Sequence, residues 1–252
     1  MTALVRDTGV VAERNLRIMA RNPSSILGAV LFPLIFLFGF FGVLGRSMDA
    51  RGLDYAQYLP PIVVVQAMFF TAIASAFFLA DDRARGLFDR YRSLPIARGA
   101  ILGGRAAADA VRASASLVVV VGGGMLLGFR FEAGLLAALA FVGLALLAAL
   151  ALAAGCGLIG LIAPSPEAAT SMLFLPYVPL LMLSTGFVPV EGFPGWLQPF
   201  VTWQPISLTV DALRALAQGG PTAEPVLKAT AVLGTLLVVF VALGARYTRS
   251  AS

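Results

Sequence analysis

Residues 81–99, DDRARGLFDRYRSLPIARG, concentrate charge in a chain of which only 12% is charged. Side chains of both signs can form salt bridges and hydrogen bonds with the surface of a soluble protein. On a helical wheel, residues 82–94 place Asp82 and Asp89 near one pole and apolar side chains on the opposite arc. The pattern predicts a two-faced helix over 82–94 that docks on a soluble partner; a loop that only sets topology is the alternative.

A second charged group follows at Arg105, Asp109 and Arg112, whose spacing puts all three on one face of a helix. A carboxylate between two guanidinium groups can form ion pairs, which lower the cost of holding charge in an apolar environment. The spacing predicts an intramembrane ion-pair ladder. Two alternatives are a gate that opens during transport and direct contact with a transported molecule.

No set of residues suited to catalysis or metal binding is evident. The chain has no histidine and a single cysteine, Cys156, so the usual histidine bases and paired thiolate ligands are missing. The glycine-rich VGGGMLLG has no lysine, and Lys228 is not in a phosphate-binding glycine loop. We therefore expect no enzyme activity, no metal site and no cofactor bound by this chain.

The rest of the chain is strongly apolar, with 59% hydrophobic residues among 252 and a mean hydropathy of +0.91. Uncharged blocks approach the about 20 helical residues that cross a hydrocarbon core of about 30 Å. We expect an all-α integral membrane protein with 1–252 as a single domain. The six expected spans are 26–45, 60–80, 100–129, 133–163, 168–190 and 226–246.

The distribution of arginine predicts the orientation in the membrane. Twelve arginines lie in the N-terminal segment, the 81–105 stretch and the C-terminal tail, whereas the opposite side has four arginines and Lys228. Loops rich in arginine and lysine stay on the cytoplasmic side. Both termini and the 81–99 stretch are therefore expected in the cytoplasm of a bacterium, with the protein in the cytoplasmic (inner) membrane.

Two segments outside the spans have distinctive patterns. Residues 1–25 carry arginines on one face and apolar side chains on the other, which predicts an amphipathic helix lying in the membrane interface; a solvated helix is the alternative. Residues 191–220 contain several prolines and both tryptophans, which predicts short re-entrant helices on the external side, opened by Pro194 and Pro205. Trp196 and Trp203 are candidate interface anchors or gate residues.

With these segments placed, the chain resembles the permease subunits of the ABC-2 membrane family, and more narrowly the daunorubicin-resistance-type drug and lipid exporters. The first matching motif runs between spans two and three, where Asp82, Arg83 and Gly86 precede a Leu94-Pro95-Ile96 element and Arg98. The second precedes the last span. It comprises Ser184, Gly186, Phe187, Pro189, Pro194, Trp196, Leu197, Asp211 and Arg214.

The resemblance implies a dimer of two permeases, identical or different, each contacting a separate ATPase subunit that binds ATP and Mg²⁺. The implied coupling residues are Asp82, Arg83, Arg85, Gly86, Phe88, Asp89, Arg90, Leu94 and Pro95. A path for a hydrophobic drug, antibiotic or lipid is implied between the first, second and fifth spans. Its candidate lining is Phe36, Phe40, Gln66, Phe69, Phe70, Met172 and Phe174, with an external gate at Phe187, Pro189, Trp196 and Trp203.

The role of Gln66 and the function of the chain each have alternatives. Gln66 could contact cargo, a second permease or, as lone amides in helices often do, a neighbouring helix. The chain could serve a polysaccharide or teichoic-acid exporter, or act as an ATP-independent membrane scaffold that recruits a soluble partner.

Overall fold

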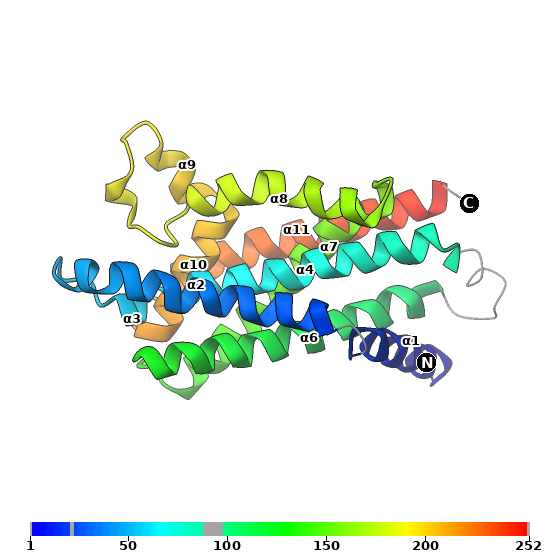
Figure 1. The fold of residues 1–252 in the computed structure, drawn as a ribbon, viewed down its shortest axis with the longest axis horizontal. Coiled ribbons are helices and arrows are strands. Elements are labelled where there is room, and N and C mark those ends of the chain that lie inside the picture. Colours follow the sequence, from blue (N-terminus) through cyan, green and yellow to red (C-terminus); the bar gives the residue numbers. More distant parts are fainter. Residues whose placement is uncertain (1, 21–22, 88–97, 251–252) are drawn as a thin grey trace.

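The computed structural model describes residues 2–20, 23–87 and 98–250, and the regular elements in these ranges are helical (Figure 1). Long helices form the body of the bundle, and short ones lie at one end of it. In chain order the elements are α1 (Thr2–Ala20), α2 (Pro23–Asp49), α3 (Tyr55–Tyr58), α4 (Pro60–Ala84), α6 (Arg98–Leu127), α7 (Leu135–Ile162), α8 (Pro166–Met182), η1 (Val190–Gly192), α9 (Gln198–Trp203), α10 (Pro205–Gln218) and α11 (Ala223–Ser250).

Five helical stretches in the described chain are long and apolar enough to cross a membrane: Leu31–Asp49, Tyr55–Ala84, Gly103–Leu127, Leu135–Ile162 and Ala223–Tyr247. They coincide with five of the six predicted spans, as expected for an integral membrane protein.

The remaining predicted span, 168–190, corresponds to α8, which has 17 residues, contains Pro176 and Pro179, and ends at Met182. At about 1.5 Å per residue, its length falls short of the about 30 Å hydrocarbon core. A sixth crossing therefore stays a prediction.

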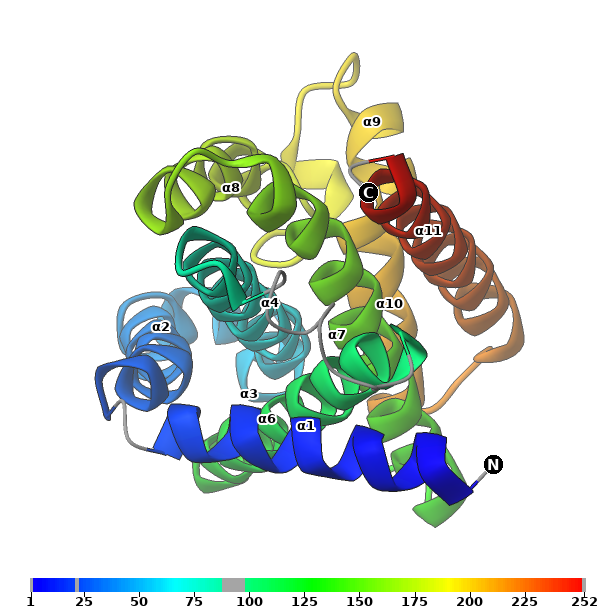
Figure 2. The same ribbon diagram turned by 90° about the vertical axis from the view of Figure 1, so that its right-hand side faces the viewer.

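Helix α4 is the centre of the bundle and packs against α2, α6, α7, α8 and α10 (Figures 1 and 2). Apart from Gln66, its sequence is apolar all round from Pro60 to Phe70, the pattern of a helix buried on every side. Close packing on α7 depends on Gly160, where an added Cβ would lie 2.6 Å from the backbone oxygen of Ala76. Small residues thus let the backbones of α4 and α7 meet.

Both termini lie at one end of the bundle, together with the end of α4 and the start of α6, whereas α3, η1 and α9 lie at the other (Figure 1). At the first end, α1 runs across the bundle and packs on α6 (Figure 2). Val11 is buried there against Gly104, whose added Cβ would lie 2.6 Å from the Val11 Cβ. The predicted N-terminal helix is present, and its position in the membrane interface stays a prediction.

The charged stretch departs from the sequence prediction of one helix over 82–94. Residues 82–84 are the last turn of α4, and Arg85 and Gly86 then form a turn in which Gly86 has φ +67°. This left-handed conformation, which glycine adopts easily, ends α4. The helix therefore does not begin at 82, and residues 88–97, with Phe88, Asp89, Arg90, Leu94 and Pro95, lie outside the described residues.

The predicted short helices over 191–220 are present as η1, α9 and α10. Pro205 opens α10 as expected, because a proline in the first turn lacks only an N–H that has no helical partner there. Pro194 does not open a helix; turns follow it, and α9 begins at Gln198 with a proline in its own first turn. Helix α10 packs inside the bundle against α7 and α11.

Candidate functional site

Asp109 and Arg112 on α6 form a buried ion pair directed at α4. The Arg112 Nη1 donates to Asp109 Oδ1 and to the Thr71 carbonyl oxygen, both at 3.2 Å. The Ser75 hydroxyl donates to Asp109 Oδ2 at 2.7 Å. Charged groups removed from water need such partners, and here α4 supplies them from a hydroxyl and a backbone carbonyl.

Arg105 is directed at a different carboxylate from the one that its spacing suggests. Its Nη2 donates to the Ser75 carbonyl at 2.6 Å, and its Nη1 lies 3.5 Å from Asp82 Oδ2 at the end of α4. Asp82 also accepts from the Arg14 Nη2 of α1 at 3.2 Å. A network of polar contacts therefore connects α1, α4 and α6. The sequence prediction did not include Arg14, Thr71 and Ser75, because each of them contacts a residue that is distant in sequence.

The coupling residues that the structure describes have different surroundings. Asp82 is directed into the bundle, whereas Arg83 donates from Nη1 to the Leu161 and Ala163 carbonyls at the end of α7. Arg85 is largely exposed and pairs with Asp81 one helical turn earlier at 2.9 Å. Arg83 and Arg85 are both exposed, and Arg83 ties the end of α4 to α7.

A cavity of about 530 Å³ opens beside this network of polar contacts, at the end of the bundle that Figure 2 faces. Elements α1, α4, α6 and α8 contribute to its walls. The lining residues are Arg14, Asn15, Phe77, Phe78, Asp81, Asp82, Arg85, Arg105, Ala108, Asp109, Arg112, Pro166 and Glu167.

Aromatic rings connect α4 to α2 and to α8, and the contact with α2 is that of Phe70 with Phe32, at 5.5 Å between ring centroids. Phe69 of α4 stacks on Tyr177 of α8 with ring centroids 3.6 Å apart. Phe70 approaches Phe174 of α8 at 5.9 Å. On α2, Phe36 stacks on Phe40 at 5.6 Å. Of the candidate path residues, Met172 differs from the rings, since it is 46% exposed on α8.

Gln66 lies one turn before Phe69 and Phe70 on α4 and is 1% exposed. Its Oε1 has no hydrogen-bond partner in the described chain, and the same is true of the Tyr177 hydroxyl. A buried polar atom without a partner costs about 1–3 kcal/mol, so natural proteins rarely leave one without a reason. Sequence reasoning selected Gln66 as the polar residue of its span and missed Tyr177.

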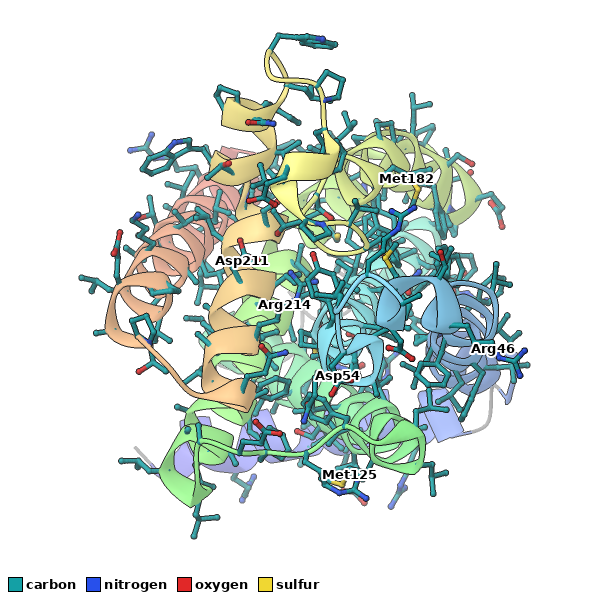
Figure 3. The ribbon with its side chains drawn as sticks, turned by 90° about the vertical axis from the view of Figure 1, so that its left-hand side faces the viewer. Arg46, Asp54, Met125, Met182, Asp211 and Arg214 are labelled. Carbon is teal, nitrogen blue, oxygen red and sulfur yellow. The ribbon has the colours of Figure 1, made fainter. Side chains whose placement is uncertain are left out.

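Arg214 of α10 is the centre of a third cluster, at the opposite end of the bundle (Figure 3). Its Nη2 donates to the Gly186 carbonyl at 2.6 Å and its Nη1 to the Thr185 carbonyl at 2.8 Å. Its Nε donates to the Tyr58 carbonyl at 3.1 Å. These bonds fasten the segment after α8 to α10 and α3. The sequence singled out Arg214 only through the family motif, without a role.

The charge of Arg214 is balanced locally by Asp211, whose Oδ1 lies 3.1 Å from Nη1 and also accepts from the Thr185 hydroxyl at 2.9 Å. Burial lowers the pKa of the Arg214 guanidinium, while Tyr58 and Asp211 act to raise it. Burial also raises the pKa of the Asp211 carboxyl, against the effect of Arg214.

The four residues of the predicted external gate do not form one cluster. Phe187 is buried and stacks on Phe40 of α2 with centroids 4.6 Å apart, so it closes the aromatic side of α4 at this end. Trp196 and Trp203 are 81% and 66% exposed, and Trp203 lies beside Lys228, 5.2 Å from its ammonium. Pro189 is the residue immediately before η1.

Comparisons with known proteins identify the class. A family model described as ABC-2 type transporter matches residues 6–217. The chain is 30% identical to the probable doxorubicin resistance ABC transporter permease protein DrrC of Mycobacterium tuberculosis, covering 88% of this chain and 81% of the relative. It is 31% identical to the daunorubicin resistance ABC transporter permease protein DrrB1 of Streptomyces coeruleorubidus, covering 90% and 81%. Nodulation protein J of Rhizobium meliloti is 30% identical, with 79% and 76% covered.

Proposed function

The chain belongs to the ABC-2 type transporter family and is a transmembrane permease of an ABC exporter, and from this premise we propose that it exports a hydrophobic or amphiphilic drug. The names of two relatives from different genera support this substrate class, since one refers to doxorubicin resistance and the other to daunorubicin resistance.

The proposed path lies along α2, α4 and α8, and the observation that carries it is the buried, unpaired Oε1 of Gln66 beside stacked aromatic rings. Aromatic side chains stack on planar apolar molecules, and one acceptor among them orients a ligand hydroxyl or amine. The Tyr177 hydroxyl adds a second polar group from α8. A ligand that separates Phe69 from Tyr177 replaces their stacking contact and gives both polar atoms a partner.

The proposed assembly contains a second permease and a separate ATPase subunit that binds ATP and Mg²⁺. Arg85 is the described coupling candidate best placed to contact the ATPase, because its side chain is 76% exposed and pairs within its own helix turn, whereas that of Arg83 is bonded to the end of α7. The bonds from Arg83 to α7 support the transfer of movement from this end into two long helices. The arginine distribution supports placing this end, with both termini, in the cytoplasm of a bacterial cell.

Transport by the complete complex tests the path. The permease is co-expressed with its ATPase and second permease, reconstituted in vesicles, and assayed for ATP-dependent movement of doxorubicin. Gln66→Leu and Phe69→Ala are each expected to reduce transport about tenfold or more, on the scale of one lost oriented contact. The matched control is Phe38→Ala, because Phe38 is on α2 but is 43% exposed and stands near Gly123 of α6. Full transport by both test variants would reject this path.

The ATPase contact is tested separately by co-purification. Arg85→Glu is expected to reduce recovery of the ATPase subunit with the permease. Arg246→Glu, a charge reversal at an exposed residue of α11 at the same end, is the control. Equal recovery of the ATPase subunit with both variants would show that Arg85 does not take part in the contact.

A further inference from the structure

The cavity between α1, α4, α6 and α8 lies outside the aromatic path, and its charges are arranged unevenly. One group of its lining residues holds three guanidinium groups, those of Arg14, Arg105 and Arg112, around two carboxylates, those of Asp82 and Asp109. Asp82 is shared by Arg14 and Arg105, whereas Asp109 pairs with Arg112. Positive charge is therefore in excess around Asp82.

The remaining charged residues of the lining have the opposite balance. Asp81 and Arg85 pair with each other. Glu167, in the first turn of α8, is exposed, and its carboxylate has no hydrogen-bond or ion-pair partner among the residues that the structure describes. The described lining is thus neutral as a whole, with four charges of each sign, but it is positive around Asp82 and negative at Glu167. A ligand that matches it carries both charges.

Apolar side chains complete the walls. Phe77 and Phe78 are half-buried and meet edge to face with ring centroids 5.8 Å apart, and Pro166 adds a third apolar surface. The volume of about 530 Å³ is within the usual size of a small-molecule site. A site of this kind, at the arginine-rich end of a membrane bundle and beneath the amphipathic α1, lies where lipid headgroups are found.

We propose that this cavity binds the headgroup of a zwitterionic phospholipid with a primary ammonium, of the phosphatidylethanolamine type. The phosphodiester lies between Arg14 and Arg105, since guanidinium groups match phosphate oxygens in geometry and charge. The ammonium lies at Glu167, and the start of the acyl chains packs on Phe77 and Phe78. The site is separate from the proposed drug path, so the lipid is a bound partner of the permease rather than its cargo.

Native mass spectrometry of the purified permease–ATPase complex tests the proposal. The complex is stripped of lipid and titrated with phosphatidylethanolamine and, separately, with phosphatidylglycerol of the same acyl chains. The wild type is expected to bind phosphatidylethanolamine about tenfold more tightly, the scale of one charge-assisted contact. Glu167→Gln is expected to bring the ratio of the two affinities to about one, while Arg105→Gln weakens both lipids. Arg246→Gln is the control and leaves both affinities unchanged.

Glu167 is an exposed side chain, so its substitution leaves the bundle intact and keeps the test decisive if Arg105→Gln fails to fold. An equal affinity of the wild type for the two lipids, or a preference that survives Glu167→Gln, would overturn the proposal. The readout is lipid binding, so its result is independent of whether the complex transports doxorubicin.

Discussion

The guanidinium of Arg214 lies over the ring of Tyr58, with its central carbon 3.5 Å from the ring centroid. This contact joins α10 to α3 across 156 residues of sequence and adds a cation–π interaction to the three carbonyl bonds of Arg214. The segment with Thr185, Gly186 and Phe187 is held between them. The end of the bundle opposite the two termini therefore depends on one buried arginine.

Replacing this arginine is expected to destabilise the protein strongly. Arg214→Lys keeps a positive charge but cannot bond three carbonyls with one planar group, so we expect a loss of about 3 kcal/mol or more in unfolding free energy. Thermal unfolding in detergent measures this loss. Arg130→Lys is the control, because the Arg130 side chain bonds the Met125 and Phe129 carbonyls at the exposed surface of the same end. Equal unfolding temperatures for both variants would contradict the role of Arg214.

Gly160 is expected to tolerate no larger side chain. Gly160→Val places its Cβ against the backbone of Ala76, which cannot move as a flexible side chain does, and overpacking of this kind costs about 1–3 kcal/mol. Gly143→Val on the same helix has no atom within 4 Å of the new Cβ. The yield of folded protein in size-exclusion chromatography should fall for Gly160→Val and not for Gly143→Val. A similar yield for both variants would show that α4 and α7 can move apart at little cost in free energy.

Asp82 is expected to hold α1 on the bundle. Asp82→Asn removes the charge shared by Arg14 and Arg105, so backbone hydrogen exchange in α1 should become faster. Asp81→Asn breaks only an exposed pair within one helix, which contributes about 0–1 kcal/mol, and serves as the control. Unchanged exchange in α1 after Asp82→Asn would mean that its packing on α6 is sufficient.

Phe187 is expected to seal the aromatic side of α4 at the end of the bundle opposite the termini. Phe187→Ala removes the ring that stacks on Phe40 and leaves a space there, so passive leak of doxorubicin from vesicles without ATP should increase. Trp196→Ala, at an exposed side chain, should leave the leak unchanged. A faster leak with Trp196→Ala instead would support the predicted role of Trp196 in the gate.

Local patterns were sufficient for much of the fold. The apolar block after Pro60 predicted α4, which extends beyond the expected end at 80 to Ala84. Pro205 predicted the start of α10. The helical wheel of 82–94 was wrong at its beginning, because periodicity does not show that Gly86 adopts a left-handed conformation. The path residues could be chosen by type, but whether Met172 joined them depended on how α8 is rotated.

The sequence by itself determined that this chain crosses a membrane, where most of its helices begin and end, and which family it resembles, because hydrophobic length, turn residues and motifs are local properties. Only the tertiary structure decided the partners of its buried charges. Arg14 meets Asp82, and Arg214 meets Tyr58, across 68 and 156 residues. A charged side chain that is removed from water is stabilised by any polar or oppositely charged partner within reach. The packing of the helices therefore decides which partner each charged side chain has.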